Sequence, residues 1–209
     1  MTVLSVTALT NFLLACEVFL FAGMLLQRPK QRYSAAWFWC GVFVLLGFSA
    51  LLGGIDHGFF EAQGLPRYVL QRGNWLVIGL VSFCMLMTTA EHFFVPRARR
   101  IVAVVGAVQL LAYTVAIYAA GSFALVIVNY VPVLGLLLVM SVRETRRGSG
   151  SAALAAGLVV MLLASAIQAL HVDRFSPLNA SGLYHVVLMA GVVFLYRGGV
   201  HLRTVRDRP

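Results

Sequence analysis

Long runs of apolar residues, separated by short polar links, follow one another along the whole chain. Each run is about 20 residues long, the length that an α-helix needs to cross the roughly 30 Å hydrocarbon core of a bilayer. A membrane β-barrel would instead show alternating polar and apolar residues. The predicted spans are residues 3–26, 34–55, 75–95, 101–119, 123–140, 152–171 and 182–200. The pattern therefore predicts an all-α integral membrane protein, a single seven-transmembrane-helix bundle occupying residues 1–209.

The links between the spans differ in length. Tight links such as 120–122 make successive helices antiparallel neighbours, so the bundle is expected to run up and down in chain order. Two longer links, 56–74 and 172–181, carry most of the polar residues on their side of the membrane. We expect a site to open there.

Composition agrees with this architecture. Of the 209 residues, 61% are hydrophobic and 11% are charged, against about 45–50% and about 25% in soluble domains. Seven spans use nearly the whole chain and leave no room for a soluble domain. The first span lacks a basic leader and is followed by Arg28 and Lys30, so an uncleaved anchor that keeps Met1 is expected.

The basic residues predict how the chain is oriented. Thirteen of the sixteen lie in alternate links and the tail: Arg28, Lys30, Arg32, Arg97, Arg99, Arg100, Arg143, Arg146, Arg147, Arg197, Arg203, Arg206 and Arg208. The other links hold Arg67, Arg72 and Arg174. Because cytoplasmic loops carry the excess of Lys and Arg, the amino terminus is predicted outside and the carboxyl terminus in the cytoplasm, in the cytoplasmic (plasma) membrane.

Several partners and cofactors are excluded by residue placement. The basic residues do not gather on one surface with aromatic groups, so nucleic acid is not an expected partner. Cys16, Cys40 and Cys84 lie in apolar runs at unrelated spacings, which argues against disulfides and thiolate metal sites. The one lysine, Lys30, lies in a link, so a retinal Schiff base within a helix is excluded. The bilayer itself remains the expected partner, and the oligomeric state is left open.

Three histidines are the strongest candidates for chemistry, because ionisable groups are costly inside a bilayer. Counting about 1.5 Å per residue from the helix ends places His57, His171 and His185 at a similar outer depth. Three imidazoles that leave one position to water are typical of catalytic zinc, and Asp56 or Asp173 could then orient ligands or accept a proton. The alternative is that each ring bonds to interfacial water or to a loop carbonyl.

Other polar residues could support such a site. Ser165, Gln168 and His171 follow one another at three-residue steps in the sixth span, and Ser181 precedes His185 by four in the seventh. Gln168 and Ser181 would either orient metal ligands or join neighbouring helices by hydrogen bonds.

Three further ionisable residues lie away from this level. Glu17, near the middle of the first span, could bond to Asn129 or Tyr130, stabilise a histidine, or belong to a proton path. Glu91 and His92 are expected to be a snorkelling pair at the cytoplasmic end of the third span, near Arg97.

Two short segments, Gly-Gly-Ile-Asp-His-Gly-Phe-Phe at 53–60 and Asn-Ala-Ser-Gly-Leu-Tyr-His-Val-Val at 179–187, resemble the second- and seventh-helix motifs of the alkaline ceramidase and adiponectin-receptor superfamily. The resemblance implies a seven-helix membrane hydrolase that holds zinc with one second-helix and two seventh-helix histidines and cleaves lipid amides. His57 and His185 match two ligands, and Ser49 or Asp56 the assisting residues. Ser181 stands at the position of the other seventh-helix histidine, so His171 would have to be the third ligand.

The leading hypothesis is therefore a zinc-dependent hydrolase acting on an amide or ester of a lipid-like substrate from the outer leaflet. A haem-binding or electron-transfer protein is the first alternative, since two histidines on facing helices can be axial ligands. The second is a noncatalytic membrane sensor, transporter or assembly subunit that uses polar residues to pack its helices.

Overall fold

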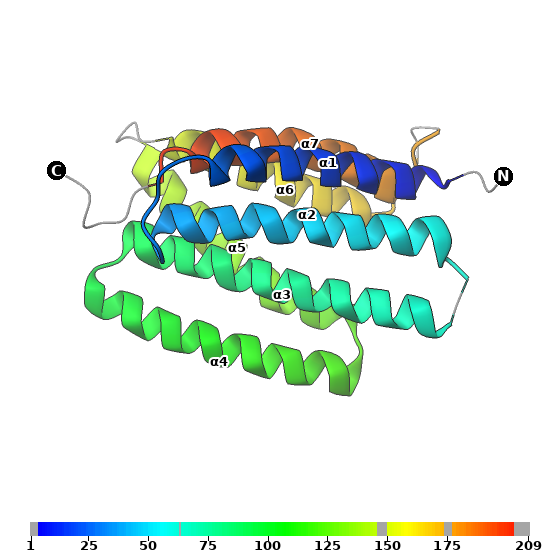
Figure 1. Ribbon diagram of the computed structural model, residues 1–209, viewed down its shortest axis with the longest axis horizontal. Coiled ribbons are helices and arrows are strands. Elements are labelled where there is room, and N and C mark those ends of the chain that lie inside the picture. The colour runs from blue at the N-terminus through cyan, green and yellow to red at the C-terminus, as the bar shows by residue number, and fades with distance from the viewer. Residues whose placement is uncertain (1–3, 63, 146–149, 174–176, 203–209) are drawn as a thin grey trace.

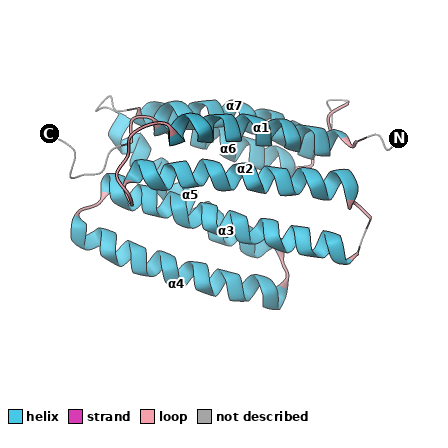
Figure 2. Cartoon of the chain, in the orientation of Figure 1, coloured by secondary structure: helices cyan, strands magenta, loops and turns pink. Residues whose placement is uncertain are grey.

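The computed structural model describes residues 4–62, 64–145, 150–173 and 177–202, and every extended regular element within them is an α-helix (Figures 1 and 2). The helices are α1 Val6–Leu26, α2 Ala35–Phe59, α3 Leu65–Phe93, α4 Pro96–Ala120, α5 Phe123–Glu144, α6 Ser151–Ala169 and α7 Ala180–Gly199. The predictions of the anchor, of the first span and of the orientation depend in part on residues that lie outside the described ranges. These residues are Met1, Val3, Arg146, Arg147, Arg174, Arg203, Arg206 and Arg208.

All seven helices of the described chain are long and apolar enough to cross a membrane. The predicted all-α bundle of seven helices is thereby confirmed, and the lengths and compositions of these helices indicate a multi-pass membrane protein. The order of helices around the bundle is less simple than chain order. Contacts run from α1 to α2, α3, α5, α6, α7 and back to α1, while α4 packs outside this ring, mainly on α3 (Figure 1).

The predicted start of the third helix at residue 75 is wrong. The helix begins at Leu65, with Pro66 in its first turn, ten residues before the predicted start of the span. The predicted long link 56–74 is therefore only residues 60–64, because α2 also continues to Phe59. Arg67, Gln71 and Asn74 consequently follow one another along one face of α3 at helical spacing.

Glycines allow the helices to approach closely both at the amino-terminal end of the bundle, where α1 begins, and at the opposite end, where α7 finishes. A Cβ on Gly53 would lie 2.9 Å from Oδ1 of Asn11, so α1 lies directly against α2. A Cβ on Gly198 would lie 2.6 Å from the backbone nitrogen of Leu154, which brings α7 against α6. Small residues make such backbone approach possible in membrane bundles.

At the other end of the bundle, the structure corrects the expected snorkelling pair. His92 is only 2% exposed, and its Nε2 lies 3.1 Å from Oε2 of Glu144 on α5. Oγ of Ser151, at the start of α6, donates to the same carboxylate oxygen at 3.2 Å. Glu91 pairs with Arg99 rather than Arg97. These groups join α3 to α4, α5 and α6 as a buried polar network.

Candidate functional site

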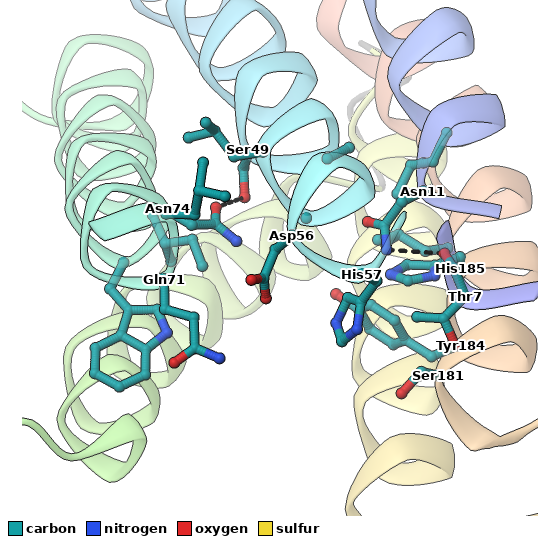
Figure 3. Close-up of a pocket in the computed structure, with 18 of the residues that line it drawn as sticks. Thr7, Asn11, Ser49, Asp56, His57, Gln71, Asn74, Ser181, Tyr184 and His185 are labelled. Carbon is teal, nitrogen blue, oxygen red and sulfur yellow. Dashed lines mark hydrogen bonds between the residues drawn. The ribbon is translucent and has the colours of Figure 1, made fainter. Parts of the chain in front are cut away.

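A polar cavity of about 390 Å³ lies at the amino-terminal end of the bundle (Figure 3). Its walls come from α1, α2, α3, α6 and α7, with Phe123 contributed by the start of α5. The polar residues lining it are Thr7, Asn11, Ser49, Asp56, His57, Gln71, Asn74, Gln168, Ser181, Tyr184 and His185. The gathering of so many polar groups around one cavity marks it as the candidate site, because polar groups within membrane helices are costly.

The cavity penetrates well into the bundle. Along α2 its lining extends from His57 at the helix end to Leu46, which is about 16 Å at the rise of an α-helix. Leu14 and Leu188 line it beside Leu46. The cavity thus has polar walls near the bundle end and aliphatic side chains further in.

Asp56 presents the carboxylate of this cavity. The residue is 5% exposed, and Figure 3 shows its side chain directed into the space between Gln71 and His57. Oδ2 lies 4.0 Å from Nε of Arg67, at the limit of an ion pair. Oδ1 is buried and has no hydrogen-bond partner among the described residues. A buried carboxylate oxygen without a partner is unfavourable, so this atom is available to a donor from a ligand.

His185 is held by the first helix. The residue is 7% exposed, and its Nδ1 lies 3.0 Å from Oγ1 of Thr10. The Thr10 hydroxyl also lies 3.0 Å from the carbonyl oxygen of Val6 and 3.1 Å from that of Thr7. A hydroxyl has one proton. When Thr10 donates it to a carbonyl, Nδ1 of His185 must be the donor, which leaves Nε2 as an acceptor in the cavity.

His57 lies in the last turn of α2 and is half-buried. Its Nδ1 lies 3.9 Å from Oε1 of Glu61, and its backbone oxygen accepts a hydrogen bond from Oγ of Ser5 at 3.2 Å. Ser5 is also the N-cap of α1. The start of α1 and the end of α2 are therefore tied together next to this imidazole.

Hydrogen bonds between the walls hold other polar groups in place. Oγ of Ser49 donates to Oδ1 of Asn74 at 2.6 Å, which joins α2 to α3 (Figure 3). Thr7 and Asn179 exchange side-chain hydrogen bonds of 3.1 and 2.9 Å, and Asn179 also caps α7 by accepting from Gly182. Hydrogen bonds thus fix the walls both between the consecutive helices α2 and α3 and between the two ends of the chain, at α1 and the start of α7.

The structure brings together most of the predicted site residues. Ser49, Asp56, His57, Gln168, Ser181 and His185 all line the cavity. His171, Asp173 and Glu17 do not. Asp173 accepts a hydrogen bond from the backbone nitrogen of Ala180 at the start of α7. Oε2 of Glu17 is buried without a partner among the described residues, and Asn129, its suggested partner, is bonded to Gln109 of α4.

His171 is the residue that departs most from the prediction. Helix α6 ends at Ala169, and His171 follows in a left-handed conformation with φ +49°. Its ring is exposed, with Nδ1 3.2 Å from the carbonyl oxygen of Ala169. Within the described ranges, no group of three or more His, Cys, Asp or Glu side chains is arranged to hold a metal ion. The donor set therefore does not fit a three-ligand zinc site.

Sequence reasoning missed several uncharged residues of the site. The candidates did not include Thr7, Thr10, Asn11, Gln71 and Asn74, because the search started from ionisable groups and the polar residues next to them in the sixth and seventh spans. Two signals were available. Thr7 and Asn11 are four residues apart, and Gln71 and Asn74 three apart, so each pair shares one helical face.

Comparisons with known proteins give a family but no activity. A family model described as a family of unknown function (DUF6962) matches residues 6–204. No curated protein and no solved structure matches the chain. The resemblance to the alkaline ceramidase and adiponectin-receptor superfamily stays a prediction.

Proposed function

This chain belongs to the DUF6962 family, and we propose that it is a membrane protein that binds the polar head of an amphiphilic molecule in the cavity at the amino-terminal end of its bundle. The observation that carries the proposal is the cavity itself: about 390 Å³, lined by polar side chains of five helices and containing a buried, unpartnered oxygen of Asp56. Ligand sites are typically cavities of this kind, with a few convergent polar groups.

The form of the cavity supports an amphiphile. Most of its polar residues lie in the first or last two turns of spanning helices, toward the level where lipid head groups meet water, and Leu14, Leu46 and Leu188 line it further in. A molecule with a polar head and an apolar portion satisfies both parts. Asp56 would accept a hydrogen bond from the head, and His185 and His57 would supply imidazole nitrogens.

The orientation predicted from the basic residues places this cavity on the outer side of the cytoplasmic membrane. Reporter enzymes fused to the carboxyl terminus test that placement, because they distinguish a cytoplasmic from an external end. A reporter active only outside the cell would reverse the orientation and move the cavity to the inner leaflet.

Hydrolysis of the bound molecule is the second candidate. The observation that favours it is that Asp56, His57 and His185 line one cavity, where carboxylate and imidazole groups could transfer protons to or from an amide or ester. Elemental analysis of purified protein, with His57→Ala and His185→Ala beside the native chain, tests whether zinc is bound. A visible absorption spectrum of the same samples tests the haem alternative, which requires a Soret band.

Native mass spectrometry tests the binding proposal. The native chain, released from its membrane in mild detergent, is expected to carry an amphiphile that Asp56→Ala loses. Ser165→Ala is the matched control, because Ser165 is exposed on α6 and, among the described residues, its hydroxyl bonds only to the carbonyl of Met161 in its own helix. Equal retention of every amphiphile by all three proteins would contradict the proposal.

A further inference from the structure

We infer that the head group bound in this cavity is an uncharged polyol, such as a sugar. The inference rests on the proposed function and names the class of ligand that the same cavity takes. Three properties of the cavity carry it: its side-chain amides, the charge around Asp56, and the occupation of its aromatic surface.

Amide side chains are unusually frequent in the lining. Asn11, Gln71, Asn74 and Gln168 come from α1, α3 and α6. Among the described residues, no hydrogen bond engages the side chains of Gln71 and Gln168 or Nδ2 of Asn74. Each amide offers both donors and an acceptor, and each hydroxyl of a polyol is both a donor and an acceptor. A ligand with several hydroxyls can therefore pair with these groups.

The charge in the cavity argues against an ionic head group. Among the described lining residues there is no Lys or Arg to bind a phosphate, and Arg67, which lies beside the lining, already faces the carboxylate of Asp56. A cationic head group is not required either, because Arg67 already faces Oδ2 of Asp56 at 4.0 Å. The unpartnered Oδ1 needs only a hydrogen-bond donor, and a neutral hydroxyl provides one.

The aromatic residues of the cavity also argue against a cationic head group. Quaternary ammonium head groups are recognised by the faces of aromatic rings. The aromatic residues lining this cavity are Trp75, Phe123 and Tyr184. The guanidinium of Arg72 lies 4.7 Å from the ring centroid of Trp75, the ring of Phe123 packs against Trp75 at 5.9 Å, and the ring of Tyr184 packs against His185 at 5.0 Å. Groups of the protein itself thus already contact each of these rings, and its own cation takes the indole.

Native mass spectrometry and equilibrium binding of the full chain, in a detergent without a sugar head, test the inference with defined probes. The probes are monoglucosyl diacylglycerol, diacylglycerol, phosphatidylethanolamine, phosphatidylglycerol, dodecyltrimethylammonium and free glucose. We expect the glucosyl lipid to bind at least tenfold more tightly than diacylglycerol and the charged amphiphiles. Asp56→Ala and Asn74→Ala should each weaken it about tenfold, the effect of losing one good hydrogen bond. Ser165→Ala should bind as the native chain does.

The outcomes separate the two proposals. Preference for phosphatidylethanolamine, phosphatidylglycerol or dodecyltrimethylammonium, with loss in Asp56→Ala, would overturn the polyol inference and leave the proposed function standing. Binding of free glucose as tight as that of the glucosyl lipid would identify a soluble polyol as the ligand and overturn the amphiphile. No binding of any probe by correctly folded native chain would overturn both. If Asp56→Ala does not fold, Asn74→Ala and Gln71→Ala make the same test.

Discussion

Thr10 and His185 are separated by 175 residues in the chain, yet Oγ1 of Thr10 lies 3.0 Å from Nδ1 of His185 beside the cavity. The contact joins α1 to α7 and closes the ring of helices. It also sets which nitrogen of His185 is available to the cavity. The geometry of the site therefore depends on the packing of the first helix against the last.

Thr10→Val should destabilise the protein and weaken ligand binding, because the imidazole of His185 loses its buried partner. Interhelical hydrogen bonds in membrane proteins are worth about 0.6 kcal/mol on average, and an unsatisfied buried group costs about 1–3 kcal/mol. We expect a loss of about 1 kcal/mol in denaturant unfolding of micelle-bound protein. Thr114→Val is the control, since in the described part of the chain the Thr114 hydroxyl bonds only to the carbonyl of Leu110 in its own helix.

A double-mutant cycle makes this prediction specific. Thr10→Val and His185→Ala should be non-additive, since each removes the same interaction. Additivity within about 0.5 kcal/mol would show that the two side chains are energetically independent.

Arg72→Lys should destabilise the contact between α3 and α4. Nη1 of Arg72 donates to the carbonyl oxygen of Ile117 at 2.7 Å near the end of α4, and the guanidinium lies 5.0 Å from the ring of Tyr68. Lysine keeps the charge but loses the planar group that makes both contacts. A decrease of about 1–2 kcal/mol in unfolding free energy is expected. The exposed Arg100→Lys should change it by less than about 0.5 kcal/mol.

Gly198→Ala should separate α6 from α7, because the added methyl would lie 2.6 Å from the backbone nitrogen of Leu154. The expected cost is about 1–3 kcal/mol, the range for overpacking. Gly23→Ala is the matched control, with no atom within 4 Å of the added Cβ, and should stabilise α1 by about 0.5–1 kcal/mol. Equal thermal stability of the two variants would mean that α6 and α7 do not pack as described.

Glu144→Ala should be the most damaging of these substitutions. It removes the carboxylate that His92 and Ser151 share in a buried site, and breaking such a pair by removing one partner costs about 3–5 kcal/mol. Glu144→Gln, which keeps an acceptor oxygen, should cost less than Glu144→Ala. Glu61→Ala, whose side chain is 63% exposed, should have little effect on thermal unfolding. Similar losses in all three would contradict a buried network.

The sequence by itself determined the helical, membrane-spanning architecture, since the length of an apolar run is a local property set by the thickness of a bilayer. It also identified Asp56, His57 and His185, because ionisable groups near the ends of spans are visible in the chain, and Gln168 and Ser181 by their helical spacing. Ser49 was named only through the family resemblance. It misplaced the start of α3, where Arg67, Gln71 and Asn74 interrupt the apolar run although their spacing is helical.

Only the tertiary structure decided which of these groups meet. Counting residues gives the depth of a side chain along the membrane normal, but not its angle around the bundle. His171 was expected at the depth of the other two histidines, but α6 ends at Ala169 and the left-handed turn after it leaves the ring outside the cavity lining. Thr10 and Asn11 became part of the site because α1 packs on both α2 and α7. That neighbour relationship arises from the packing of whole helices, which no local pattern records.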